Sequence, residues 1–442
     1  MKVGCSSEKL KYNLVFRSVC TTFVPKMAQL PIEFIRETRL VMGEERFNSY
    51  MEAFNEEAPT SIRLNPKYNF KTKPQHTVPW CEEGFYLKGR PQFTFDPLFH
   101  AGCYYVQEAA SMFVCHVLNT FLSPLSTLHS PLYVLDLCAA PGGKSTAARS
   151  VLPEGSVLVS NEPIASRAQI LLENITKWGW PDCIVTNNYP RDYRKAKMQL
   201  DVIICDVPCS GEGMFRKDPA TIGEWSLQNV EKCWRLQREI VADAWECLNP
   251  GGLLIYSTCT FNTKENEENV RWIMETYDAE ALSVPIEPEW GIIGSLLPDF
   301  DAPVYRFIPG ITKSEGLFLC SLRKSGEWRV ESGERNELRQ IQGLRILSPL
   351  SIPEQSSPTR SLSLHTLLKI DLPYSEAIRY LRGEALVLPA DTPRGFVTVT
   401  YKGIPLGLVK NIGNRANNLY PKPWRIKTTH LPTEPPEIIR LK

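Results

Sequence analysis

The chain has 442 residues, of which 43% are hydrophobic and 22% are charged, and its formal net charge is +1. This length suits about two to four domains with cores of their own. The near-neutral charge excludes a uniformly basic nucleic-acid-binding chain, so any such surface must come from local asymmetry. Since no run of about 18 apolar residues occurs, we expect no membrane span and a cytoplasmic protein.

Thirteen cysteines occur, an odd number, and none of them forms a CxxC pair. This pattern predicts neither a disulfide framework nor a zinc cluster, so we expect no metal. Most of the thiols are expected to be buried and inert in a reducing compartment.

The first 26 residues lack the apolar stretch of a signal peptide. Met27 is followed by a helix start with Pro31 in its first turn. We therefore expect Met27, rather than Met1, to be the initiator, and residues 1–26 to form a disordered extension.

Residues 27–127 predict an N-terminal unit. Apolar residues at helical spacing within 28–57 predict two helices broken near Gly43. Residues 61–66 predict a strand that ends at a proline, and residues 100–122 predict a helix.

The central part of the chain alternates between short apolar runs and helical stretches. The runs predict strands at 133–137, 157–159, 183–185, 202–205 and 253–256. Short apolar strands separated by helices imply a parallel sheet covered on both faces. A later strand at 318–322 is predicted to form an antiparallel hairpin with residues 303–308.

Residues 326–365 are polar and punctuated by serine and proline, which is typical of a linker. Beyond them, residues 396–401 and 404–409 predict a β-hairpin. Residues 400–442 carry eight Lys or Arg and two Glu, a local excess of six positive charges.

The first chemical motif runs from Leu135 through the small-residue turn 138–143 to Lys144. Small residues let backbone N–H groups approach a ligand, and a helix N-terminus favours its negative group. A purely structural strand–turn–helix is the alternative, and the spacing of a phosphate-binding P-loop is absent. Glu162, after the second strand, suits either a ribose diol or the N-terminal charge of the next helix.

Two cysteines follow neighbouring strands of the predicted sheet. Asp206 and Cys209 come after one strand, and Cys259 comes after the next. Because the carboxyl ends of parallel strands meet at one edge, both thiols are candidates to face one pocket. The residues alone leave a catalytic pair and two inert thiols equally open.

Three linked motifs resemble those of the RNA 5-methylcytosine methyltransferases of the Nop2/Sun family. They are Cys138–Lys144, the stretch Asp206-Val-Pro-Cys209-Ser-Gly-Glu-Gly-Met-Phe-Arg-Lys-Asp218 and the stretch Tyr256-Ser-Thr-Cys259-Thr-Phe261. The middle stretch is most similar to the bacterial RsmF branch, which methylates 16S ribosomal RNA. The resemblance extends upstream through Val106–Ser111 and runs from about residue 28 to the C-terminus.

The resemblance implies an α/β fold with a Rossmann-like class I methyltransferase domain at 128–325. Before it would stand an N-terminal helical and ferredoxin-like (RRM-type) unit, and after the linker a PUA-like β domain at 366–442. Segments Gly403–Gly407 and Asn417–Pro421 are similar to that RNA-binding domain.

The implied activity is methylation of cytosine C5 in RNA, with S-adenosylmethionine as cofactor. A thiolate that adds to C6 makes C5 nucleophilic, and a base must later remove the C5 proton. The resemblance implies that Cys259 attacks C6, that Cys209 assists elimination, and that Asp206 binds the N3 side of the ring. DNA cytosine methyltransferases use a Pro-Cys nucleophile, so sequence logic alone could exchange the two thiols.

The resemblance also implies the cofactor contacts. Glu162 would bind the ribose and Asp206 would lie near the amino group or methyl. The methionine part would be cradled by Cys138, Ala139, Ala140, Pro141, Gly142, Gly143 and Lys144. The acidic residue usual near adenine is missing, and Asn188 or Tyr189 is expected to hydrogen-bond or stack there instead. Arg167 and Asn174 are expected to be structural.

The expected partner is RNA, namely 16S rRNA or the 30S subunit, bound by a monomer in rRNA processing. Arg216 and Lys217 beside the catalytic loop are expected to grip phosphates, and Lys144 and Lys217 are possible cationic neighbours of the thiolate. The C-terminal candidates mix basic and aromatic side chains: Tyr401, Lys402, Lys410, Asn411, Arg415, Tyr420, Lys422, Trp424, Arg425 and Lys427. Three alternatives stay open: a solvated face for this mixture, tRNA as substrate, and a non-catalytic RNA-binding assembly factor.

Overall fold

The computed structural model describes residues 30–122, 131–327, 341–347, 367–428 and 431–441. The predicted extension at 1–26 and the initiator Met27 lie outside the described residues, as does most of the linker predicted at 326–365. Within the described part, no helix is long and apolar enough to cross a membrane.

An eight-stranded sheet forms the centre of the molecule, with the order β11-β13-β10-β9-β6-β7-β8 and β12 paired to β13. Strands β6 to β10 run parallel to one another, whereas β11, β12 and β13 pair in antiparallel fashion at one side. The strands are β6 Tyr133–Asp136, β7 Val157–Asn161, β8 Cys183–Thr186, β9 Leu200–Asp206, β10 Leu248–Thr258, β11 Glu280–Leu282, β12 Val304–Phe307 and β13 Leu317–Arg323. All five predicted parallel strands and the predicted antiparallel hairpin are confirmed.

Helices cover both faces of this sheet, as its unbroken apolar strands predict. They are α4 Phe113–Leu122, α5 Gly143–Val151, α6 Ala165–Trp178, α7 Pro190–Lys195, α8 Leu227–Cys247 and α9 Glu267–Tyr277. Alternate residues of β9 point to opposite faces, so Val202 and Ile204 join one core and Ile203 and Cys205 the other. The first core contains α4 and α5, and the second contains α7, α8 and α9.

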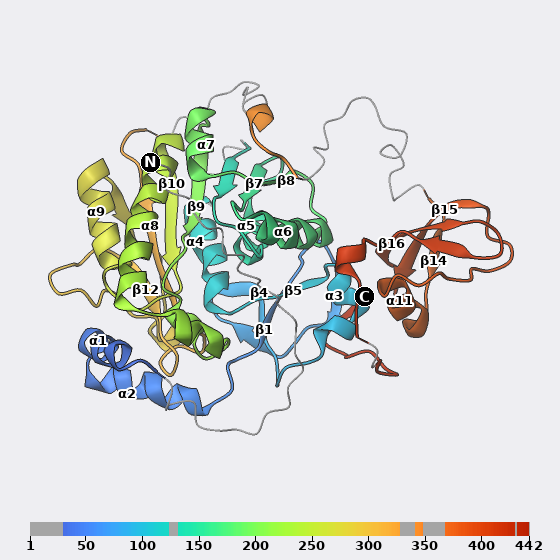
Figure 1. Ribbon diagram of the computed structural model, residues 1–442, viewed down its shortest axis with the longest axis horizontal. Coiled ribbons are helices and arrows are strands. Elements are labelled where there is room, and N and C mark those ends of the chain that lie inside the picture. The colour runs from blue at the N-terminus through green and yellow to red at the C-terminus, as the bar shows by residue number, and fades with distance from the viewer. Residues whose placement is uncertain (1–29, 123–130, 328–340, 348–366, 429–430, 442) are drawn as a thin grey trace, which may run out of the picture.

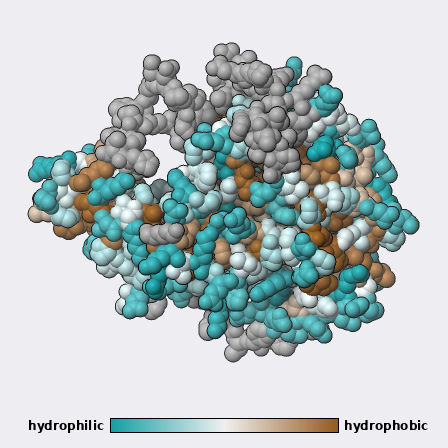
Figure 2. Space-filling view, turned by 180° about the vertical axis from the view of Figure 1, so that it is seen from behind, coloured by the Kyte–Doolittle hydropathy of each residue, from teal (hydrophilic) through white to brown (hydrophobic). Residues whose placement is uncertain are grey.

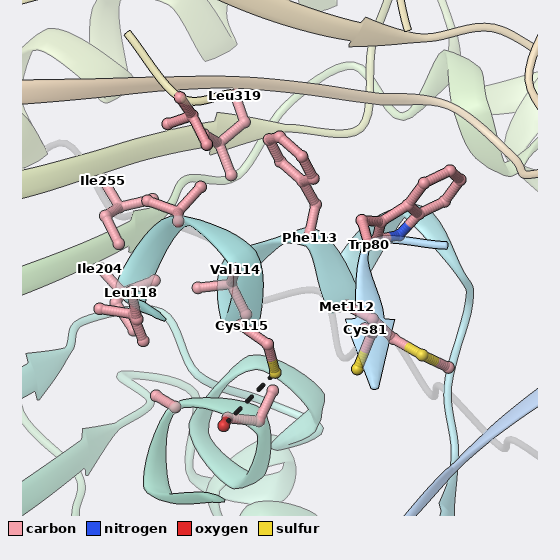
Figure 3. Close-up of a cluster of buried hydrophobic side chains, with 14 of the residues drawn as sticks. Trp80, Cys81, Met112, Phe113, Val114, Cys115, Leu118, Ile204, Ile255 and Leu319 are labelled. Atoms are coloured by element: carbon pink, nitrogen blue, oxygen red, sulfur yellow. Dashed lines mark hydrogen bonds between the residues drawn. The ribbon is translucent and has the colours of Figure 1, made fainter. Parts of the chain in front are cut away.

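The core beneath α4 shows this packing directly (Figure 3). Phe113 and Leu118 of α4 face Ile204, Ile255 and Leu319 of the sheet. On the other side of the helix, the Cys115 thiol donates to the carbonyl of Ala147 in α5, with Sγ and O 3.6 Å apart. Cys115 is thus one of the buried thiols that the sequence predicts.

In its described residues, the N-terminal unit combines three α-helices with a four-stranded antiparallel sheet of order β3-β4-β1-β5. Its elements are α1 Ile32–Met42, α2 Glu44–Glu52, β1 Ser61–Leu64, β2 Phe70–Thr72, β3 His76–Val78, β4 Cys81–Tyr86, α3 Pro97–His100 and β5 Tyr104–Val106. The break at Gly43, between α1 and α2, is confirmed. The single helix predicted at 100–122 is wrong over its first half, because Tyr104–Val106 pairs with β1 as strand β5.

Helices α1 and α2 pack under the loops that carry the motifs. The ring of Phe34 lies 5.0 Å from that of Phe215, and the ring of Tyr50 lies 5.2 Å from that of Phe261, centroid to centroid. Phe215 follows Cys209 and Phe261 follows Cys259 in the sequence. The aromatic cluster therefore connects α1 and α2 to both cysteine loops.

The C-terminal domain shares a hydrophobic core with the N-terminal unit and lies beside α3 (Figure 1). Its elements are β14 Lys369–Asp371, α11 Tyr374–Leu381, β15 Gly395–Tyr401, β16 Ile404–Asn411, β17 Ala416–Asn418 and β18 Arg440–Leu441. The hydroxyl of Tyr374 donates to the carbonyl of Phe95 at 3.1 Å, and the last strand, β18, pairs with β2. The predicted β-hairpin is confirmed as β15 and β16.

The surface mixes hydrophilic and hydrophobic residues. On the face opposite that of Figure 1, hydrophilic residues cover most of the area and hydrophobic residues reach the surface in places (Figure 2). The exposed large apolar side chains are distributed over several parts of the described chain, among them α1, α6, α8 and the C-terminal domain.

Candidate active site

Two thiols meet where neighbouring parallel strands end. Cys209 follows β9 and Cys259 follows β10, and their Sγ atoms lie 3.3 Å apart. The backbone N–H of Cys259 also donates to the Cys209 sulfur at 3.3 Å. Among the described cysteines, Cys183 and these two are half-buried and the others are buried. The structure thus brings the two predicted thiols into one place that solvent partly reaches.

The two thiols are not equivalent. The hydrogen bond with Cys259 and burial hold the pKa of the Cys209 thiol well above its usual range, and the charges of Cys259 and Glu265 raise it further. Two groups this close share their protons, so one sulfur ionises before the other. The raised pKa keeps the Cys209 thiol protonated, and its Sγ lies within hydrogen-bonding distance of the Cys259 sulfur.

Asp206 and Lys144 form an ion pair in the same site. The Nζ atom of Lys144 lies 2.8 Å from Oδ2 of Asp206, and the Ser257 hydroxyl donates to Oδ1 at 2.8 Å. Burial lowers the pKa of Lys144, but the charges of Asp206, Asp136 and Cys259 outweigh burial and raise it overall. Lys144 therefore stays cationic where a thiolate needs an opposite charge.

The turn between β6 and α5 is braced by helix α6. Arg167 donates to the carbonyl of Ala140 at 3.0 Å, and Asn174 donates to the carbonyl of Pro141 at 2.8 Å. Both side chains thus have the structural role that the sequence predicts. Gly142 ends the turn with a φ of 114°, a left-handed conformation that favours glycine, and α5 begins at the next residue.

Buried acceptors beside this turn fit the implied cofactor. Oδ2 of Asp136 accepts from the Ser145 hydroxyl at 2.7 Å, whereas Oδ1 has no hydrogen-bond partner within the described residues. Glu162 accepts from the N–H of Ile164 at 2.9 Å through Oε1, and its Oε2 makes no hydrogen bond but lies 3.4 Å from Nη1 of Arg167 in an ion pair. Such buried oxygens favour a ligand that brings hydroxyl or ammonium donors, and S-adenosylmethionine carries both.

Asp136 is a candidate that the sequence analysis did not single out. It is fully buried, and burial raises its pKa to about 7. The available signal was its position, because it is the last residue of β6 and lies two residues before the small-residue turn. Glu162 has the capping role that was one of the two interpretations open at the sequence level, since Oε1 accepts from the backbone before α6, and its Oε2 pairs with Arg167.

The expectation that Asn188 contacts adenine needs correction. Its Nδ2 donates to the carbonyl of Arg345 at 3.2 Å, and its Oδ1 accepts from the Arg345 N–H at 2.9 Å. Residues 341–347 were predicted to belong to a linker, but they lie beside β8. There Arg345 makes hydrogen bonds to both polar atoms of the Asn188 side chain. Tyr189 is 56% exposed and remains the candidate for stacking.

The expectation that Arg216 grips a phosphate is also wrong. Its guanidinium lies 3.0 Å from Oε1 of Glu315, and the two side chains are 7% and 3% exposed. Burial raises the pKa of Glu315 to about 7, although the charge of Arg216 opposes this. The neighbouring Lys217 is exposed and keeps the predicted role as a proposal.

The C-terminal candidates divide between core and surface. Tyr401, Asn411 and Tyr420 are buried, so the expectation that they meet RNA is wrong. Tyr420 instead packs at the contact with the N-terminal unit, where its hydroxyl lies 3.3 Å from Nδ1 of His100. The exposed candidates are Lys402, Lys410, Arg415, Lys422 and Lys427, and Trp424 and Arg425 are half-buried.

Three family models match successive parts of the chain. The N-terminal domain of 16S rRNA methyltransferase RsmF matches residues 30–109, and 16S rRNA methyltransferase RsmB/F matches residues 125–323. The methyltransferase RsmF PUA domain matches residues 367–426. All three predicted parts therefore have counterparts in one family, in the predicted order.

Curated relatives and solved structures agree with this order. Ribosomal RNA small subunit methyltransferase F from an Enterobacter species is 27% identical over 89% of this chain and 95% of its own length. The enzyme of that name from Serratia proteamaculans is 32% identical over 68% of this chain and 64% of its own. NSun6 from Pyrococcus horikoshii, solved with SFG, covers 68% of this chain and 99% of its own at 20% identity and a TM-score of 0.56, which shows the shared fold. The chain belongs to the RsmF family of S-adenosylmethionine-dependent 16S rRNA methyltransferases.

Proposed function

We propose that this protein methylates cytosine C5 in 16S rRNA through a covalent bond between Cys259 and C6. The observation that carries the proposal is the pair of unlike thiols, 3.3 Å apart, in the same site as the Lys144–Asp206 ion pair. Addition requires a sulfur that attacks C6, and elimination requires that the C5 proton and the same sulfur leave, so a second thiol beside the first can assist the departure.

Cys259 supplies the nucleophile. Its thiolate forms a bond to C6, and the electron pair of the C5–C6 double bond then makes C5 nucleophilic. Lys144 stabilises the thiolate before attack, because it is buried and its charge is retained. Asp206, fixed by Ser257 and Lys144, brings a proton to N3 of the ring, and this shared proton draws electrons away from C6.

Cys209 acts after the methyl group has moved. The C5 proton must leave so that its electrons can restore the double bond and expel the sulfur of Cys259. A water molecule takes the C5 proton, and the Cys209 thiol, 3.3 Å from the Cys259 sulfur, donates a hydrogen bond to that sulfur as the C6–S bond breaks. Its raised pKa suits the role, because a thiol that resists ionisation does not compete with Cys259 for C6.

The residues around the β6–α5 turn would hold the cofactor, which supplies an electrophilic methyl group when bound. Asp136 and Glu162 offer buried acceptors, and the N-terminus of α5 after Gly142 offers N–H donors. The backbone of 138–143 lies at the carboxyl end of β6, so that it and the thiols share one edge of the sheet.

The target base must leave its stack to reach this site, at a cost of a few kcal/mol. Contacts elsewhere on the RNA have to offset that cost. Lys217 beside the cysteine loop and the exposed C-terminal lysines are the proposed phosphate contacts.

Methyl transfer tests the proposal. Purified protein is given labelled S-adenosylmethionine and either 30S subunits or naked 16S rRNA, and the product is mapped by bisulfite sequencing. We expect one protected cytosine in the preferred substrate and none with a Cys259→Ala variant. Label on another base, or label that leaves every cytosine bisulfite-sensitive, would overturn the C5 assignment. Transfer to tRNA in place of rRNA would keep the chemistry and replace the substrate.

A further inference from the structure

We propose that Glu265 and Glu212 are positioning residues that assign the two thiols to different steps: Glu265 holds the Cys209 loop and Glu212 holds the Cys259 loop. Both carboxyl groups are buried behind the site and neither is used in the chemistry described above. This inference rests on the proposed function and concerns how the protein keeps two neighbouring cysteines from exchanging roles.

Glu265 fixes the chain on both sides of Cys209. Its Oε2 accepts from the backbone N–H of Ser210 at 3.0 Å, one residue after the thiol. The same oxygen accepts from Nε2 of Gln237 at 2.7 Å, and that amide also donates to the carbonyl of Pro208 at 2.9 Å, one residue before the thiol. Glu265 and Gln237 together therefore clamp the backbone that presents Cys209.

Glu212 fixes the chain after Cys259 in the same manner. Its Oε2 accepts from the backbone N–H groups of Phe261 at 2.7 Å and Asn262 at 3.1 Å. The next residue, Gly213, donates its own N–H to the carbonyl of Cys259 at 2.8 Å. A Cβ on Gly213 would come within 3.0 Å of that carbonyl and 2.8 Å of the Gly316 backbone, so the contact leaves no room for a side chain.

The side-chain amide of Asn262 connects Glu212 and Glu265. Nδ2 of Asn262 donates to Glu212 at 3.1 Å and to Glu265 at 2.8 Å. Each cysteine loop is thus held by a carboxylate, and the carboxylates are held relative to each other. The separation of the two sulfurs is set by this network as well as by their direct contact.

The charge of Glu265 also distinguishes the thiols. Burial raises the pKa of Glu265 to about 7, and its negative charge is among the causes that raise the pKa of Cys209. Glu212 and Cys209 face Glu265 from the cysteine loop, Cys233 faces it from α8, and Tyr256 faces it from β10. All of these groups become or stay uncharged or negative, and none of them supplies a positive charge. An ionised Glu265 therefore repels the negative charge that Cys209 would gain on ionisation.

The test uses site-resolved alkylation of the full-length protein, followed by mass spectrometry of each cysteine peptide. Removal of the Glu265 charge by Glu265→Gln should increase the Cys209 thiolate and its alkylation rate by about three- to tenfold at pH 8. At pH 6, where Glu265 of the parent protein is protonated, the two rates should converge. A merely structural effect of the substitution would not depend on pH in this way.

RNA adducts supply the second readout. Glu265→Gln should let the Cys259–RNA adduct form but slow its release, so that the adduct accumulates. Glu212→Gln should instead slow adduct formation by about tenfold or more, because it loosens the loop of the nucleophile. Glu268→Gln, in the first turn of α9 and three residues after Glu265 but outside the network, should match the parent protein in both assays.

A second variant covers the case in which Glu265→Gln does not fold. Gln237→Met keeps the side-chain volume but removes the donor to Pro208 and Glu265, and it should give the same adduct accumulation. If both variants leave Cys209 alkylation and adduct release at parent levels, or if both glutamates give one phenotype, the inference is wrong. If Cys259→Ala still forms an RNA adduct, the proposed function fails instead.

Discussion

The active site and the C-terminal domain were both predicted from short stretches of sequence. The structure brings the predicted active-site residues together, but it buries several of the residues predicted to bind RNA. In the sheet, Cys209 and Cys259 lie together because each follows a parallel strand and such strands end at one edge. In the C-terminal domain, a mixture of basic and aromatic residues was grouped by composition, and Tyr401 and Tyr420 are core residues. Position relative to a strand end thus carried more information than residue type.

The same periodicity that located the strands could have placed Tyr401. Successive residues of a strand point to opposite faces, so Tyr401 shares a face with Val397 and Val399 of β15. Both valines are buried, and the tyrosine is buried with them.

The largest effect is expected at Asp206. Asp206→Asn keeps the shape of the side chain but removes the charge that pairs with Lys144, so kcat/KM should fall by about 10²- to 10⁴-fold. Ser257→Ala removes one neutral hydrogen bond to the same carboxylate and should cost much less. Single-turnover methyl transfer measures both, and equal losses would show that Asp206 has no special part.

Tyr420 should matter for stability and not for stacking on RNA. Its ring is buried against Tyr380 and near His100, so Tyr420→Ala should lower the free energy of unfolding by about 3 kcal/mol. Chemical denaturation measures this loss. A variant that unfolds like the parent protein but binds RNA weakly would restore the rejected assignment.

Asp136 gives the stability a defined pH dependence. Its pKa is about 7 in the folded protein and about 4 in an unfolded chain, so the folded state binds more protons between these values. The stability from this group is complete below about pH 4 and is lost as the pH rises towards 7. Asp136→Asn should make Tm fall less steeply with pH over that range. If Tm depends on pH as in the parent protein, burial does not raise the pKa of Asp136 as stated.

The smallest effects are expected at the exposed lysines of the C-terminal domain. Lys410→Ala and Lys422→Ala should each weaken RNA binding a few-fold and reduce the slope of log Kd against log salt by about 1. Salt titrations of RNA affinity measure this. If a substitution at either site changes neither the RNA affinity nor its salt dependence, that lysine lies on a solvated face that does not contact RNA.

The central domain was the most predictable part of the chain. Apolar runs gave all five parallel strands, and the order of the motifs gave the edge at which the site lies. Strand β5 was missed, because Tyr104–Val106 is three residues long and lies between helical stretches, so its pairing with β1 decides its conformation. Local periodicity cannot reveal a strand that depends on a distant partner.

Within the site, the pattern identified residue types but not their partners. Arg216 follows the cysteine loop, whose position was predicted correctly. Its guanidinium nevertheless forms an ion pair with Glu315, which is far from it in the sequence, and is largely buried. Asn188 is held by Arg345 in a segment that has the composition of a linker. Asp136 was passed over because a single acid at the end of an apolar strand is not distinctive without the burial that the fold supplies.

The role of Cys259 as nucleophile can be tested most directly by mapping the RNA adduct. A Cys209→Ala protein is incubated with substrate RNA and S-adenosylmethionine, digested, and examined by mass spectrometry. The proposed roles predict a cytosine nucleotide attached to the peptide that contains Cys259, and no adduct in a Cys259→Ala protein. An adduct attached to Cys209 in the Cys259→Ala protein would contradict the account and exchange the two thiols.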